Sequence, residues 1–119
     1  VVGHVIHASL NSSKVLLITD SRSAVDSLFQ ESRKSGIVVG TGEDICEMKF
    51  VSISAKVSIG DKVVSSGLGG VFRKGLLVGS VVDIVKEGHE LFQGISLATS
   101  VDFSNLEELV VLLSGQEEM

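Results

Sequence analysis

The stretch GDKVVSSGLGGVFRKGLLVGSVV, residues 60–82, decides the fold class of this chain. A Gly-Asp pair opens it, and a short apolar run at 62–65 follows. Glycines and serines then separate this run from a longer apolar one at 76–85, which predicts short strands joined by tight turns. The glycines supply the positive φ angles and close strand approach that such turns need. No helix is predicted after 67–70, so the stretch lacks the helix N-terminus of a phosphate-binding loop.

Strand patterns continue on both sides of this stretch. The run KVLLIT at 14–19 is typical of a strand buried on both faces. Further on, alternation places Cys46, Met48 and Phe50 on one face of a strand. At most one helical turn is expected, at 104–109, where a serine cap precedes two leucines. The remaining expected strands lie at residues 2–9, 25–31, 37–39, 46–53, 57–59, 89–99 and 107–113.

The composition supports an all-β fold. The 119 residues include 19 Val and 8 Ile, which favour strands, and no Pro, Trp or Tyr. The net charge is -5 and no segment is strongly basic, which disfavours a nucleic-acid partner. The lone Cys46 excludes a disulfide within the chain and is expected to be a small buried hydrophobe. We predict two small packed β-barrel or sandwich modules, residues 1–55 and 56–119, the first incomplete at its start.

Two candidate active sites lack a full motif. A serine hydrolase on a chymotrypsin-like double β-barrel would use His4 or His7 together with Asp20 and Ser66. Ser66, however, lies in neither a Gly-x-Ser-x-Gly nor a Gly-Asp-Ser-Gly pattern. A metal site would need His4, His7 and His89, yet the first two fall on opposite faces of a strand.

A third candidate is a biotinyl or lipoyl carrier module. The tetrapeptide Glu47-Met48-Lys49-Phe50 is similar to the carrier sequence around the modified lysine. Lys49 lies inside an alternating strand, however, where an outward-facing lysine is expected, and not at a hairpin tip. We therefore predict no catalytic residue, no metal and no cofactor. The hydrolase and the carrier remain alternatives to a binding protein.

The ordered motifs resemble those of MreC, a family of rod shape-determining proteins. Residues 60–82 carry its Gly-Asp-x-Val-Val, Gly-Gly-x-Phe and Val-Gly-x-Val elements, with Arg73 where the family usually has Pro. The likeness extends to 2–5, 13–20, 36–42 and 102–112. Within it, Asp61 is expected to be a turn residue that accepts backbone hydrogen bonds. The structural motif comprises Gly60, Asp61, Ser66, Gly67, Gly69, Gly70, Phe72, Gly75 and Gly79.

The resemblance implies a non-enzymatic scaffold outside the cytoplasm, on the periplasmic side. An N-terminal helix absent from this stretch of chain would hold it in the inner membrane. It implies self-association and binding to the elongation transpeptidase of the penicillin-binding class. Contacts with MreD and the MreB system would run through the N-terminal part. These contacts would direct lateral peptidoglycan synthesis and rod shape.

The residues themselves limit what an interface can be made of. The chain has five Phe as its only aromatic residues apart from His, so the usual aromatic anchors are scarce. Phe29 and Phe50 are the candidate interface anchors. We expect broad aliphatic contacts, micromolar binding that is nearly insensitive to salt, and self-association that depends on concentration.

Overall fold

The computed structural model describes residues 1–88, 90–102 and 111–112, and this part of the chain is all-β, as predicted. Its described residues contain no helix that could span a membrane. The helical turn expected at 104–109 lies outside the described residues, as does most of the strand expected at 107–113. The strands are β1 (Gly3–Ala8), β2 (Ser13–Leu17), β3 (Ala24–Phe29), β4 (Ser35–Gly40), β5 (Ile45–Ser52), β6 (Lys62–Ser65), β7 (Leu77–Val85) and β8 (Phe92–Thr99).

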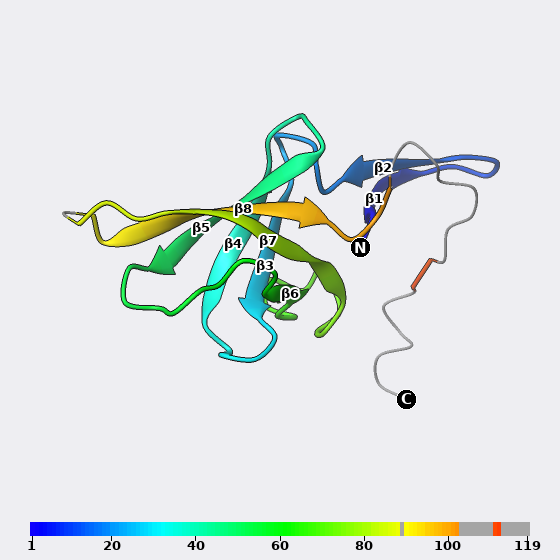
Figure 1. Cartoon of the computed structure of the whole chain (residues 1–119). Helices are drawn as coiled ribbons and strands as arrows, with labels where there is room; N and C mark the ends of the chain where they lie inside the picture. The colour runs from blue at the N-terminus through cyan, green and yellow to red at the C-terminus, as the bar shows by residue number, and fades with distance from the viewer. Residues whose placement is uncertain (89, 103–110, 113–119) are drawn as a thin grey trace.

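One closed antiparallel barrel holds six of these strands, in the order β3-β4-β5-β8-β7-β6, and pairing of β3 with β6 completes the ring. Strands β1 and β2 form a separate antiparallel pair, which we call the arm. Figure 1 shows the arm projecting from one end of the barrel, while the turn between β7 and β8 extends at the other end. Closure pairs both edges of every barrel strand, whereas each strand of the arm has one partner among the described residues.

The predicted division at residues 55 and 56 does not match this topology. Strands β3, β4 and β5 precede it and β6, β7 and β8 follow it, yet all six close the same barrel. The pairings of β3 with β6 and of β5 with β8 join strands that are distant in sequence. Turn patterns are local and do not reveal such pairings. The structure divides instead between the arm and the barrel.

Alternation along the barrel strands fills the interior. In β3, Val25, Ser27 and Phe29 are buried, while the residues between them are more exposed. Cys46 is buried as predicted, and this burial raises the pKa of its thiol to about 11. Burial of aliphatic side chains from all six strands is the main driving force for closure. The other buried core residues of these strands are Val38, Met48, Val51, Val63, Val78, Val81, Ile95 and Leu97.

The run at 14–19 is not buried on both faces, contrary to the prediction. Val15 and Leu17 are exposed on the arm, and Ile18, which follows β2, is the residue of this run that joins the barrel core. The arm is a two-stranded sheet in the described chain, and such a sheet has no second layer to cover its side chains. Its base is attached to the barrel, because the Val1 ammonium group donates a hydrogen bond to the Leu77 carbonyl oxygen at 2.8 Å.

Candidate functional site

An irregular point in the pairing of β5 with β8 marks the candidate site. Met48 pairs with Ile95, and the next paired residue, Val51, is opposite Gln93. Two residues of β5 therefore face Gly94 alone, which is the arrangement of a β-bulge. Bulges bend the strand and redirect side chains, and they are frequent where a sheet carries a binding site.

Phe50 lies in this bulge. Its φ is 63°, in the left-handed region that non-glycine residues rarely adopt, and its side chain is 58% exposed. The prediction that Phe50 shares one face of the strand with Cys46 and Met48 is therefore wrong. The extra residue shifts the alternation, and Val51 takes the next inward position.

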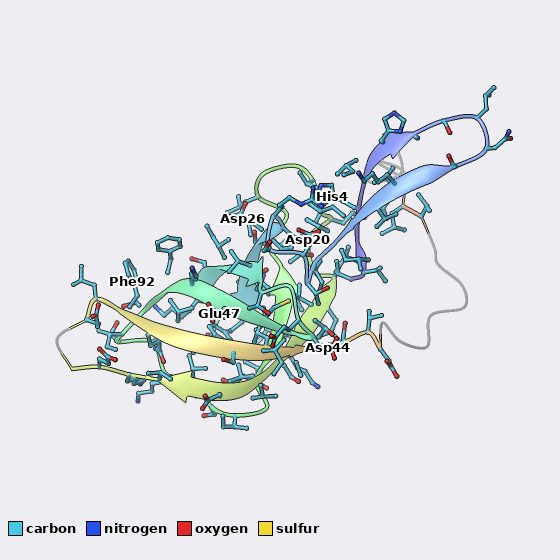
Figure 2. The ribbon with its side chains drawn as sticks, turned by 90° about the horizontal axis from the view of Figure 1, so that it is seen from above. His4, Asp20, Asp26, Asp44, Glu47 and Phe92 are labelled. Carbon is cyan, nitrogen blue, oxygen red and sulfur yellow. The ribbon has the colours of Figure 1, made fainter. Side chains whose placement is uncertain are left out.

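A second exposed aromatic side chain packs against Phe50. The Phe92 ring meets it edge to face, with centroids 5.6 Å apart and ring planes at 87°. Phe92 is 48% exposed at the start of β8, and Figure 2 shows it at the end of the barrel away from the arm. These two rings, together with Val85 and Gly94, line an open groove of about 350 Å³, which we call the aromatic groove.

Sequence reasoning found part of this site. It singled out Phe50, but it missed Phe92, Val85 and Gly94. The available signal was Gly94, because a glycine that interrupts an apolar strand indicates a bulge or a close backbone approach. Phe29, the other predicted anchor, is 2% exposed within the barrel core and is therefore not accessible to a partner. The alternation of β3 carries it inward.

Most of the predicted structural motif forms the loop 66–75 between β6 and β7, which we call the glycine loop. Gly67, Gly69, Gly70 and Gly75 all have φ values from 75° to 83°, which glycine adopts readily. From the same loop, the Phe72 ring packs edge to face on His4 of the arm, with centroids 5.4 Å apart. The glycine loop therefore contacts the arm.

Serine hydroxyls hold the glycine loop against the barrel. The Ser65 hydroxyl donates to the Arg73 carbonyl oxygen and accepts the Leu76 N–H at 3.0 Å. The Ser66 hydroxyl donates to the carbonyl oxygen of Asp26 in β3 at 3.0 Å. These bonds tie both ends of the loop to neighbouring strands.

The remaining motif residues lie at turns and strand contacts. Gly60 has a φ of 93°, and the Asp61 carboxylate accepts the N–H of Ser58 at 2.9 Å, which is the hydrogen bond expected of a turn residue. Gly79 in β7 faces the backbone of Ala98 so closely that a Cβ there would overlap its carbonyl oxygen. Close strand approach requires glycine at this position.

The structure does not assemble the hydrolase candidate. The Ser66 hydroxyl is bonded to a backbone carbonyl oxygen, and His4 packs on Phe72. The Asp20 carboxylate forms an ion pair with Arg22 at 2.9 Å, and the hydrogen bonds from Arg22 lower the pKa of Asp20 to about 2. Ser66, His4 and Asp20 thus each have a separate structural partner.

Within the described residues, the structure assembles neither the metal site nor the carrier module. No three His, Cys, Asp or Glu side chains come together there, and His89 lies outside the described residues. Lys49 belongs to β5, which is paired with both β4 and β8, and not to a hairpin tip. A carrier lysine needs a protruding turn to reach its modifying enzyme, and this position does not offer one.

Comparison with known proteins relates this fold to one family. The chain matches the model of the rod shape-determining protein MreC, barrel core, over residues 1–113. The cell shape-determining protein MreC of Cereibacter sphaeroides is 33% identical over 117 residues, covering 98% of this chain but 37% of that protein. The chain therefore spans well under half the length of this relative.

Solved structures agree with this similarity. The crystal structure of MreC from Pseudomonas aeruginosa superposes with a TM-score of 0.80 at 28% identity, covering 83% of this chain and 64% of that one. A chain in the complex between penicillin-binding protein PBP2 and MreC from Helicobacter pylori superposes with a TM-score of 0.62 at 28% identity. That match covers 70% of this chain and 52% of the other.

Proposed function

The chain belongs to the MreC family of rod shape-determining proteins, and we propose that it acts as a non-enzymatic scaffold of the bacterial cell-elongation machinery. The observation that carries this proposal is the family match over residues 1–113, which includes the whole barrel and the arm. In this role the barrel presents binding surfaces, and the peptidoglycan chemistry belongs to its partners. Lateral wall synthesis and rod shape would follow from where those partners are held.

The partner we propose first is the elongation transpeptidase of the penicillin-binding class. A related chain is found in a complex of PBP2 with MreC, which supports this choice. The chain also carries exposed large apolar side chains on the barrel and on the arm, and such surfaces usually mark sites of association. We propose that the protein also self-associates, with the exposed aliphatic residues and single-partner strands of the arm as the contact surface.

The proposed location is the periplasmic side of the inner membrane. The chain covers 37% of the Cereibacter sphaeroides relative. From the family resemblance, we propose that the whole protein contains an N-terminal membrane helix that holds the barrel at the membrane. Contacts with MreD and the MreB system are proposed for that N-terminal part. No nucleic acid is proposed as a partner, because the net charge is -5.

A binding measurement with the transpeptidase tests the proposal. The extracytoplasmic part of the elongation penicillin-binding protein from the same organism is titrated with this chain by calorimetry, at low and at high salt. We expect micromolar affinity that changes little with salt, because salt screens charge pairs and does not screen apolar contacts. A division-specific penicillin-binding protein from the same organism is the control and should not bind.

Two results would contradict the proposal. The first is absence of binding to the elongation transpeptidase at concentrations well above micromolar. The second is binding that collapses at high salt, which would mean that charge carries the interface. An esterase activity that disappears in Ser66→Ala would favour the hydrolase instead.

A further inference from the structure

The bulge in β5 exposes the Phe50 ring to solvent and places its backbone in a strained conformation. A non-glycine residue in the left-handed region is strained relative to glycine, and Phe50 has a φ of 63°. The ring gains little burial in return, since it is 58% exposed. Strained, exposed positions of this kind are found preferentially at binding sites, where the conformation serves a ligand and not the fold.

The aromatic groove has the size of a side-chain pocket. Its volume is about 350 Å³, and a cavity of about 150 Å³ is enough to take up a benzene ring. The groove can therefore accept one or two large apolar side chains. A stable contact between two proteins buries about 800 Å² on each partner, so the groove would be one anchoring pocket within a larger contact.

Charge disfavours a second copy as the occupant. Glu47 and Lys49 line the groove, and the neighbouring turn between β7 and β8 adds Lys86, Glu87 and Glu90. Acidic residues outnumber basic ones among these five, and the chain as a whole carries a net charge of -5. Two copies meeting at this face would bring like charges together, whereas an apolar segment with neutral or basic flanks would not.

We infer that the aromatic groove receives one or two large apolar side chains from a short segment of the elongation transpeptidase, seated between Phe50 and Phe92. The inference rests on the proposed function, and adds to it the surface that is used and the chemistry that it recognises. Val85 adds an apolar side chain to the lining, and Gly94 adds none. The edge-to-face pair presents ring surface at a low entropic cost, which suits an anchoring pocket.

Two variants remove the groove while sparing the barrel. Phe50→Gly deletes one ring and also relieves the left-handed strain, so its folding should be preserved. Phe92→Ala deletes the other ring from a half-exposed position. Ile59→Ala is the matched control, because Ile59 is 63% exposed and is not part of the groove lining. All three are titrated with the extracytoplasmic part of the transpeptidase, and thermal unfolding is followed in parallel.

The expected result is binding at least ten-fold weaker for Phe50→Gly and Phe92→Ala, at a nearly unchanged unfolding temperature, with Ile59→Ala like the wild type. Sedimentation of the same variants without the transpeptidase should show self-association like that of the wild type. Wild-type affinity in both groove variants would overturn the inference while leaving the proposed function intact. Loss of self-association with transpeptidase binding retained would also overturn it, because the occupant would then be a second copy. Failure of the wild type itself to bind would instead reject the transpeptidase as the partner.

Discussion

The arm and the aromatic groove both expose large apolar side chains, but for different physical reasons. On the arm, Val15 and Leu17 are exposed because a two-stranded sheet has no layer above it within the described chain. At the groove, Phe50 belongs to a closed barrel whose interior takes up the neighbouring residues of the same strand. Its exposure requires a bulge and a left-handed backbone. An exposed side chain that the fold could have buried is the stronger indication of a binding site.

The arm and the groove also differ in the backbone geometry on which each depends. Near the arm, Gly79 allows β7 to approach the backbone of Ala98, and the Val1 ammonium group binds the carbonyl oxygen of Leu77 in the same strand. At the groove, the irregular residue is a phenylalanine and not a glycine. Substitution of Gly79 should therefore affect folding, and substitutions of the exposed rings at the groove should affect binding. Three measurements test this difference between the arm and the groove.

The largest effect is expected for Gly79→Val. Its branched side chain would overlap the Ala98 carbonyl oxygen in a paired strand, and we expect a loss of about 3 kcal/mol in the free energy of unfolding. Gly70→Ala is the control, because a Cβ there meets nothing within 4 Å and only its φ of 75° is unfavourable. It should cost about 1 kcal/mol. Urea unfolding measures both, and equal losses would mean that close strand approach is not what Gly79 provides.

A smaller effect distinguishes strain from packing at the groove. Phe50→Gly and Phe50→Ala remove the same ring contact with Phe92, but only glycine relaxes in the left-handed region. We expect the glycine variant to be more stable than the alanine variant by about 1 kcal/mol. The usual order in a strand is the reverse, because glycine normally destabilises it. Chemical unfolding measures the stability of both variants. An alanine variant more stable than the glycine variant would show that the bulge is unstrained.

The smallest effect on stability is expected on the arm. Leu10, at the turn between β1 and β2, is fully exposed, so Leu10→Ser should change the free energy of unfolding by less than about 0.5 kcal/mol. If the arm is the self-association surface, the same variant should shift sedimentation toward the monomer. Its transpeptidase affinity should stay at the wild-type value. A loss of transpeptidase binding in Leu10→Ser would place that partner on the arm and end the distinction between the two regions.

The strand content, the glycine loop and the turn at Asp61 could be predicted from the residues alone. Each depends on short-range chemistry: β-branched runs favour strands, glycines permit positive φ, and a turn aspartate accepts a nearby N–H. The buried state of Cys46 was also predicted, because a cysteine in an alternating apolar strand usually points inward. These features need no knowledge of which strands become neighbours.

The strands that close the barrel, and the apolar residues that remain exposed to solvent, depend on contacts between distant parts of the chain. Alternation assigns side chains to two faces, but it does not say which distant strand pairs with β5 or whether a layer covers KVLLIT at 14–19. It fails for Phe50 because one extra residue in a strand exchanges the two faces for everything that follows. That exchange is set by pairing with β8, which begins about forty residues after Phe50, and so it is not encoded in any local pattern.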